Sequence, residues 1–351
     1  MLEIDGSYGE GGGQILRTAL SLSCLFRKPF RLFNIRKGRR KPGLMPQHLA
    51  CVRLLTLISK AEVSGAEVGS TVLVFEPGES EGGEYFFDIG TAGSTPLLLQ
   101  AVLPPLIFAQ DASRITLTGG THVPFSPPYH FISQVFLPML GRLGIEASAS
   151  ISRYGFYPKG GGKISAVVNP CRTIGAVSFG EPGDIVSVSG ISAVGSLPVE
   201  IAERQKRSVL SALAGLPVTP STEVLKVDTY SPGTFVFLKA ETETSVSGFS
   251  SLGERGKRAE TVGEEAAREL LRHLEAGGCL DPRLADQLVV YLSLAEGPSS
   301  FTTSRISGHL LTNLMVIGAF SGTRFQVEGE KEKPGRVRII PALRPSTKFF
   351  P

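Results

Sequence analysis

An internal repeat constrains the fold of this chain more than any other feature of its sequence. The first copy is expected to contain a strand, a helix and a strand at Leu2–Asp5, from Gln14 and at Arg31–Ile35. The second copy has the same elements in the same order at Tyr85–Asp88, from about Pro96 and at Arg114–Thr118. Asp88 follows Asp5 by 83 residues, and Arg114 follows Arg31 by the same interval. A fixed offset of this kind indicates a duplicated structural unit.

Each copy is expected to continue with a second helix and two further strands. His48-Leu49 and Phe131-Ile132 each open an apolar stretch after a proline-containing turn, as at the start of a helix. Each unit therefore reads strand, helix, strand, helix, strand, strand. Generic alternation of strands and helices remains the alternative, because such patterns are degenerate.

A third unit is expected to be interrupted by an insertion. Its first strand is assigned to Lys163–Val168, and its other elements follow Asp281 at Leu284–Ala295, Ser300–Ile306, Gly308–Phe320, Arg324–Glu328 and Arg336–Pro341. The stretch 178–277 has its own strands and two helical patterns, Pro198–Ala214 and Thr261–Ala276. We therefore expect an α/β (α+β) fold. Residues 1–177 and 278–351 would form a large domain of three βαβαββ repeats, and residues 178–277 a small inserted α/β domain.

The composition is that of an ordinary globular protein. Of 351 residues, 42% are hydrophobic and 19% are charged, and the net charge of +4 falls short of the dense basic face of a non-specific nucleic-acid binder. The longest apolar run is interrupted by Gln100 and two prolines, so no membrane span is expected. The first residues lack a secretion signal, which predicts a cytoplasmic location. The four cysteines are far apart and are expected to be small core residues.

A glycine-rich loop is the first candidate binding element. Three glycines, Gly11–Gly13, follow Glu10 and precede a helix, where bare backbone can approach a phosphate closely. The pattern is neither a Walker loop nor a dinucleotide fingerprint, and a purely structural turn is at least as good a reading of the glycines alone. Glu10 beside them is able to hold a hard cation, and Arg17 a phosphate.

A basic turn is the second candidate. Arg36 and Arg39 belong to a cationic run over 36–43 that follows a strand, and Gln47 and His48 then begin a helix. Arginine suits bidentate phosphate contacts, and the helix N-terminus adds to the positive field. A solvated basic turn without a ligand is the alternative.

His309 is the candidate nucleophile. It opens the equivalent helix of the third unit, after Ser307 and Gly308 in the positions of a cap and a close-approach glycine. A helix N-terminus disfavours imidazolium, which leaves a neutral ring whose lone pair can attack phosphorus. From position alone, a structural histidine is the commoner case.

These segments together resemble the RNA 3′-terminal phosphate cyclase family over nearly the whole chain. The matching segments are DGSYGEGGGQILR at 5–17, IRKGRRKPGLMPQHL at 35–49, GFYPKGGGKI at 155–164, LADQL at 284–288 and GHLLTN at 308–313. Several motifs in the same order are far more specific than one glycine loop. The resemblance implies a large domain of three βαβαββ units with a small α/β insert, in agreement with the repeat.

The resemblance also implies a reaction in three steps. His309 attacks the α-phosphorus of ATP and forms a histidine–AMP phosphoramidate with release of pyrophosphate. The RNA 3′-phosphate takes the AMP to give an RNA(3′)pp(5′)A end, and the adjacent 2′-hydroxyl then expels AMP to leave a 2′,3′-cyclic phosphate. ATP and an RNA 3′-phosphate end are the implied substrates, with Mg²⁺ or Mn²⁺ as the metal. The oligomeric state is left open.

The family's functional residues map onto this chain motif by motif. Phosphate or RNA-end binding is implied for Arg17, Arg36, Arg39, Gln47 and His48. Metal binding is implied for Glu10, and nucleotide binding for Glu10, Gly11, Gly12, Gln14, Gln100, Pro127, Phe131, Arg283, Asp286 and Gln287. A core role is an equally good reading of Phe131, given its apolar helical setting.

Two departures from the family pattern bear on these assignments. Arg283 stands where some relatives place a tyrosine against the base, which puts nucleotide preference in doubt rather than activity. Tyr154 stands where the glycine-rich signature usually begins with a basic residue. The alternatives are a catalytically inactive cyclase-like scaffold in ribosomal RNA processing and an enolpyruvyl transferase, whose architecture is broadly similar.

Overall fold

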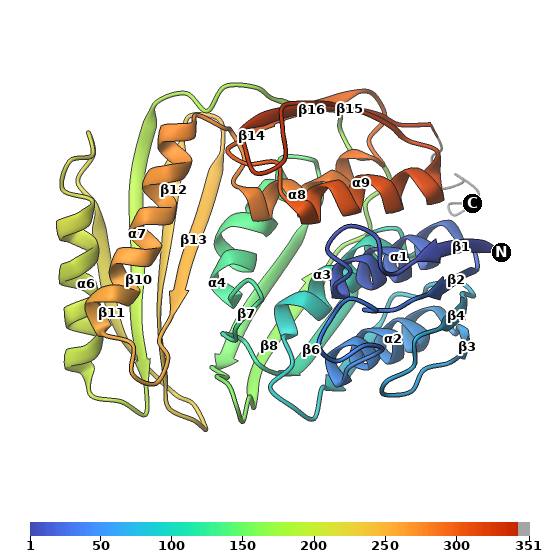
Figure 1. Cartoon of the computed structure of the whole chain (residues 1–351), viewed down its shortest axis with the longest axis horizontal. Helices are drawn as coiled ribbons and strands as arrows, with labels where there is room; N and C mark the ends of the chain where they lie inside the picture. Colours follow the sequence, from blue (N-terminus) through green and yellow to red (C-terminus); the bar gives the residue numbers. More distant parts are fainter. Residues whose placement is uncertain (343–351) are drawn as a thin grey trace.

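Three copies of one βαβαββ arrangement make up most of the chain in this computed structural model, which describes residues 1–342 (Figure 1). The first unit contains β1 (Leu2–Asp5), α1 (Gly13–Phe26), β2 (Phe30–Phe33), α2 (Pro46–Ser59), β3 (Glu62–Ser64) and β4 (Leu73–Glu76). Its sheet has the order β1-β2-β4-β3. β1 and β2 are parallel, and the other pairs are antiparallel.

The second unit repeats this topology. It contains β5 (Glu84–Asp88), α3 (Thr95–Ile107), β6 (Ser113–Gly119), a helical stretch of α4 (Tyr129–Phe131), η1 (Ile132–Phe136) and α5 (Leu137–Gly141), then β7 (Ala147–Arg153) and β8 (Gly162–Val168). The order is β5-β6-β8-β7, again with the first pair parallel. Helices α2 and α4 begin 83 residues apart, so the offset in the sequence is an offset in the structure.

The third unit has the same order with a different first strand from the one predicted. It contains β9 (Ser178–Phe179), α8 (Pro282–Leu292), β14 (Ser299–Thr303), α9 (Gly308–Ser321), β15 (Arg324–Glu328) and β16 (Gly335–Ile340), in the order β9-β14-β16-β15. The assignment of Lys163–Val168 to this unit was wrong, because that segment is β8, paired antiparallel with β6 and β7 in the second sheet. The predicted α/β class and the three repeats are confirmed.

An extra α/β segment lies between β9 and α8. It contains β10 (Ile185–Gly195), α6 (Val199–Ala212), β11 (Ser221–Val227), β12 (Gly233–Thr242), β13 (Val246–Leu252) and α7 (Ala259–Ala276), with the sheet order β11-β10-β12-β13. Figure 1 shows it at one end of the molecule, with α6 and α7 beside its sheet. Val262, Ala266 and Leu270, spaced four apart on α7, are buried in a core of its own. That this insert is a separate domain stays a prediction.

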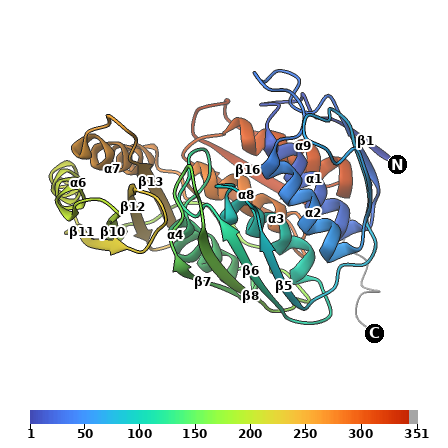
Figure 2. The same cartoon turned by 90° about the horizontal axis from the view of Figure 1, so that it is seen from below.

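The helices of the three units pack on one another, and their sheets lie outside them (Figure 2). α1 contacts α2, α3 and α9, and α8 contacts α9 and α3. β5 and β7 alternate between more and less exposed residues, as expected for sheets with one face toward solvent. This arrangement brings the start of α9 next to the start of α1, although they are far apart in the sequence. All four cysteines are buried and free, as predicted.

No helix among residues 1–342 combines the length and the apolar character needed to cross a bilayer.

Buried histidines join the insert to the three-unit body. His122 Nε2 lies 3.0 Å from His130 Nδ1, and the His122 ring stacks on Phe235 of β12 with 4.1 Å between centroids. On the other side, His273 of α7 lies 2.8 Å from the Ser304 hydroxyl, which follows β14. Burial lowers the pKa of His130 and of His273 to about 4 and that of His122 well below its ordinary value. These rings are therefore neutral in the folded chain at neutral pH.

Mild acid is expected to destabilise the fold through these rings. The unfolded chain takes up protons near pH 6.5, whereas the folded chain resists them until about pH 4 at His130. The contribution of these neutral rings to the free energy of unfolding is therefore fully present above pH 6.5. It is lost as the pH falls from 6.5 toward 4. For His130 alone the loss in the free energy of unfolding by pH 5 is about 2 kcal/mol. Denaturant unfolding at pH 7.5 and pH 5.0 measures it. The difference in the free energy of unfolding between the two pH values should be about 2 kcal/mol smaller in His130→Gln than in the parent. The same difference in both proteins would contradict this explanation.

Candidate active site

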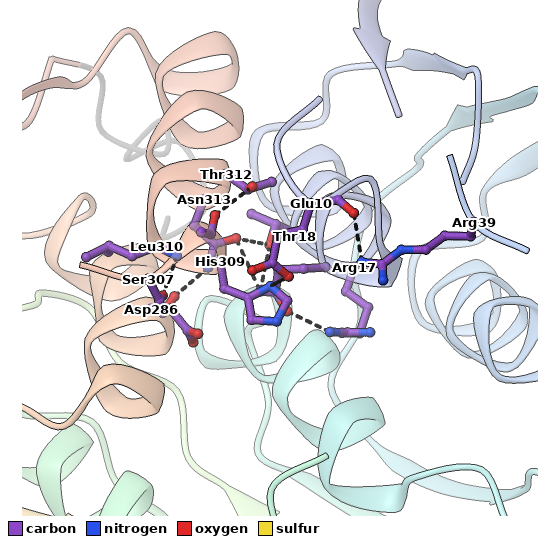
Figure 3. Close-up of polar contacts among 12 residues, drawn as sticks. Glu10, Arg17, Thr18, Arg39, Asp286, Ser307, His309, Leu310, Thr312 and Asn313 are labelled. Carbon is purple, nitrogen blue, oxygen red and sulfur yellow. Dashed lines mark hydrogen bonds and ion pairs between the residues drawn. The ribbon is translucent and has the colours of Figure 1, made fainter. Parts of the chain in front are cut away.

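The start of α9 presents His309 toward the first unit. Ser307 caps the helix, with its hydroxyl accepting from the Leu310 N–H at 3.0 Å, so the predicted cap is confirmed. The His309 side chain is 45% exposed, and its Nδ1 lies 3.2 Å from Glu10 Oε2. Nδ1 itself is covered and forms no hydrogen bond with any group of residues 1–342. Figure 3 shows the ring reaching from α9 toward Glu10 and Arg17.

The glycine-rich loop between β1 and α1 is shaped to fit against α9. Gly9 and Gly11 have φ values of 61° and 54°, in the left-handed region that favours glycine. A Cβ on Gly9 would lie 2.4 Å from Thr312 Oγ1, and a Cβ on Gly308 would lie 2.6 Å from Glu10 Oε1. The close approach of the loop to the helix therefore depends on bare backbone on both sides.

A buried polar network fixes α1 against α8 and α9. The Thr18 hydroxyl donates to Asn313 Oδ1 at 2.7 Å, and Gln14 Nε2 donates to the same oxygen at 3.2 Å. Asn313 Nδ2 donates in turn to the Asp286 carbonyl. Thr18 and Asn313 were not among the predicted site residues. Asn313 does lie in the GHLLTN segment, one turn along α9 from His309, and that spacing was the available signal.

Arg17 and Arg39 lie near His309, and Arg36 lies near His48. Arg17 donates to Gln14 Oε1 at 2.6 Å, which is the one hydrogen bond found for its guanidinium among residues 1–342. Arg39 Nη2 donates to the Glu10 carbonyl at 2.7 Å. Arg36, with a φ of 54°, donates to the Gly43 carbonyl at 3.5 Å. Most of the guanidinium N–H groups thus remain available to an anion.

Gln47 and His48 lie at the start of α2, and His48 is close to Arg17 and Arg36. His48 Nδ1 accepts from the Met45 N–H at 3.0 Å, so this neighbour assigns the proton of a neutral ring to Nε2. Burial, then Arg17 and Arg36, lower the pKa of His48 to about 3. Nε2 faces Gly13, where an added Cβ would lie 2.5 Å away. Gln47 borders Gly93 in the loop after β5.

The pKa of His309 lies below its ordinary value. Burial is the main cause, and the charges of Arg17 and Arg39 lower the pKa further, while Glu10 raises it. The imidazole is therefore neutral at neutral pH, with its lone pair free for a nucleophilic role. The helix N-terminus acts in the same direction.

The remaining predicted residues divide into two groups. Gln100 Nε2 donates to Gln287 Oε1, and both line a small crevice of about 40 Å³ with Gln14, Arg17 and Asp286. Burial raises the pKa of the Asp286 carboxyl well above its ordinary value.

The second group lies apart from His309. Phe131 is 1% exposed and packs in the core, which agrees with the structural reading. Pro127 is buried ahead of α4, and Arg283 pairs with Glu269 of α7 at 3.4 Å. Among residues 1–342, no hydrogen bond or ion pair joins these three to the cluster around His309. The structure thus assembles Glu10, Gly11, Gly12, Gln14, the three arginines, Gln47, His48 and His309, with Gln100, Asp286 and Gln287 beside them.

Known proteins resemble this chain over nearly its whole length. The family model described as RNA 3′-terminal phosphate cyclase matches residues 8–327. The RNA 3′-terminal phosphate cyclase of Pyrococcus abyssi is 44% identical over 97% of this chain and 99% of its own, and that of Methylococcus capsulatus is 42% identical over 97% and 96%. Among solved structures, the enolpyruvyl transferase NikO from Streptomyces tendae covers 96% of this chain and 48% of its own, with 8% identity and a TM-score of 0.42. A likeness that low carries no functional inference.

Substitutions around His309 are expected to move its pKa in opposite directions. Glu10→Gln should lower the pKa, because it removes the negative charge that favours imidazolium. Arg17→Gln should raise it, because it removes a cation that opposes protonation. NMR titration of the histidine side chains measures both, with the resonance assigned by His309→Asn. Arg53→Gln, an exposed change further along α2, is the matched control. A rise in Glu10→Gln would contradict the proposed electrostatics.

Proposed function

Because this chain belongs to the RNA 3′-terminal phosphate cyclase family, we propose that it uses ATP to convert an RNA 3′-phosphate into a 2′,3′-cyclic phosphodiester through a covalent AMP on His309. One observation supports this proposal above the others. A neutral, half-exposed imidazole stands at a helix N-terminus beside the Glu10 carboxylate and the guanidinium groups of Arg17 and Arg39. That is the environment a nucleophile needs in order to attack a phosphoryl group.

The attacking atom in this proposal is Nε2 of His309. Nδ1 is covered, so the exposed part of the ring lies on its other side, where a substrate has access. The ring becomes cationic when Nε2 bonds to phosphorus. Glu10, 3.2 Å from Nδ1, stabilises that charge, in keeping with its effect of raising the His309 pKa. Glu10 thus favours the transition state more than the resting neutral ring.

In the first step, the Nε2 lone pair attacks the α-phosphorus of ATP, the bond to the bridging oxygen breaks, and pyrophosphate leaves. Negative charge accumulates on the phosphate oxygens as this happens. Arg17 and Arg39 neutralise it without reorganising, because neighbouring groups already hold their side chains. The first N–H groups of α1 add to this field, since its N-cap, Gly12, provides no side-chain acceptor for them.

The second and third steps use the same positive surface. An oxygen of the RNA 3′-phosphate attacks the phosphoramidate, the P–N bond breaks, and His309 recovers its lone pair. The 2′-hydroxyl then attacks the 3′-phosphorus, its proton passes to solvent, and AMP departs. Arg36, Gln47 and His48 are placed to hold the RNA terminus, with His48 offering a neutral N–H donor. The final step is intramolecular, so correct placement supplies much of its rate.

A metal requirement also belongs to this proposal, and Glu10 is its protein ligand. Among residues 1–342, no group of three or more His, Cys, Asp or Glu side chains is arranged to hold a metal ion. Mg²⁺ in phosphoryl transfer is commonly held by one or two carboxylates and the substrate phosphates, and Mn²⁺ accepts the same ligands. One carboxylate beside a phosphate-binding corner fits that pattern. When bound, the cation supplies further neutralisation of the triphosphate.

The nucleoside is assigned to the region of Gln100, Asp286 and Gln287, with Pro127, Phe131 and Arg283 as further candidates. The crevice there is too small for adenine, so side chains must shift when ATP binds. Arg283 would stack on the base only after leaving Glu269. An inactive scaffold in ribosomal RNA processing is the alternative function. The family assignment rules out the second alternative, an enolpyruvyl transferase.

Incubation with α-labelled ATP is expected to leave acid-labile, alkali-stable label on the protein. His309→Asn should abolish the label, because Asn offers no nucleophilic nitrogen. Arg17→Gln should slow labelling by about 100-fold, the typical effect of removing one charge-stabilising donor from an active site.

Arg53→Gln is the matched control and should label at the parent rate. Thermal unfolding of each variant separates loss of chemistry from loss of fold. Label retained by folded His309→Asn would overturn the covalent mechanism, and a parent protein that takes no label but binds a pre-ribosomal RNA would favour the scaffold.

A further inference from the structure

A large cavity separate from the His309 cluster lies between the insert and the second unit. Its volume is about 800 Å³, within the range of ligand sites in proteins. The second unit contributes Phe125 from the loop after β6 and Tyr157 from the loop after β7. The insert contributes Arg204 from α6 and the loop between β13 and α7, including Arg255. Nothing in the cyclase chemistry described above uses this cavity.

Aromatic rings stand open to solvent at this cavity. Phe125 is 103% exposed and Tyr157 is 69% exposed, whereas Phe156, which also lines the cavity, is 4% exposed. Two large exposed rings on one cavity cost solvation free energy unless a ligand covers them. Phe125 also has a φ of 62°, a left-handed backbone conformation that is uncommon for residues other than glycine.

The rim of the cavity is cationic. Arg204, Arg255 and Lys257 line it against a single acidic residue, Glu254. Lys257 is held by Glu265, and Arg204 lies 3.7 Å from Glu260. Arg255 is exposed and has no hydrogen bond or ion pair within the described part of the chain. Exposed aromatic rings beside a free cation such as Arg255 are features with which proteins hold single-stranded nucleic acid.

A continuous strip of backbone connects the cavity with the His309 cluster. Gln47 borders Gly93, where an added Cβ would lie 3.7 Å from the Gln47 Cβ. The Gly120 N–H donates to the Gly93 carbonyl at 2.7 Å, and the chain runs from Gly120 into the cavity wall at His122 and Phe125. These contacts connect Gln47, where the 3′ end of the RNA is proposed to lie, with the second-unit wall of the cavity.

We propose that this cavity binds the RNA upstream of its reacting 3′-phosphate, with a base against Phe125 and Tyr157 and a backbone phosphate on Arg255. The proposal rests on the proposed function, because it takes RNA as the substrate. It assigns a role to the insert: the three repeats hold the reacting end, and the insert holds the body of the strand. The contacts are with stacked bases and phosphates, so little sequence preference is expected.

The test compares RNA of two lengths, each with a 3′-phosphate. One is a trinucleotide, which reaches the His309 cluster alone, and the other has about 15 nucleotides, enough to reach a second site. Binding is measured by fluorescence anisotropy without ATP, so no turnover is needed. Phe125→Ala with Arg255→Gln should raise the Kd of the longer RNA about 10-fold or more, the effect of losing one stacked base. The Kd of the trinucleotide and labelling by α-labelled ATP should not change.

Matched controls are available on the same molecule. Phe86→Ala removes an exposed ring from β5, and Arg272→Gln removes an exposed cation further along α7. Neither lines the cavity, so this control pair should bind both RNAs as the parent does. In the cavity variant, the slope of log Kd against log salt for the longer RNA should also fall, by about 0.7 for each lost phosphate contact.

Each other outcome overturns the proposal. Parent-like binding of the longer RNA by the cavity variant would show that the strand runs elsewhere, and equal losses for both lengths would show a disturbed catalytic end. Loss of ATP labelling in the cavity variant would assign the cavity to the nucleotide instead. A different result would contradict the proposed function itself: the parent protein would take no label from α-labelled ATP.

Discussion

Bare backbone at the junction between the β1–α1 loop and the start of α9 is the constraint on which the candidate site depends. The Glu10 carboxylate occupies space that a side chain at position 308 would fill, and Gly9 likewise leaves space for Thr312. Two units distant in sequence therefore meet closely enough for one to supply His309, the proposed nucleophile, and the other its charged surroundings. The Asn313 side chain stabilises the same junction, because its amide group accepts a hydrogen bond from Thr18 of α1 and donates one to the Asp286 carbonyl of α8.

Charge at this junction is balanced around one ring. Burial and two guanidinium groups lower the pKa of His309 and keep the ring neutral. Glu10 raises the pKa, but the net shift is still downward. A neutral ring can attack, and a nearby carboxylate favours the cation that the attack produces. The same guanidinium groups that keep protons off the ring also attract phosphate. In the proposed mechanism, nucleophile activation and phosphate binding are therefore two effects of one electrostatic arrangement.

Much of this organisation could be predicted from the sequence, because short local sequence patterns indicate it. The 83-residue offset, the cap at Ser307 and the glycine loop all depend on residues near one another in the chain. The first strand of the third unit was missed because β9 has only two residues and shows no alternation, whereas β8 alternates clearly. The pairing of Arg283 with Glu269 depends on tertiary packing against α7. Local periodicity contains no signal for such a contact.

The insert occupies the connection between the first strand and the first helix of its unit. In the first unit that same connection is the glycine-rich loop beside His309, and in the second it contains Gly93, beside Gln47. One topological position has thus been given three lengths while every strand order stayed the same. The third unit provides His309, the proposed nucleophile, from the start of its other helix, away from the connection that contains the insert. Such a scaffold can acquire new substrate contacts by lengthening a single loop, with its reaction centre held constant.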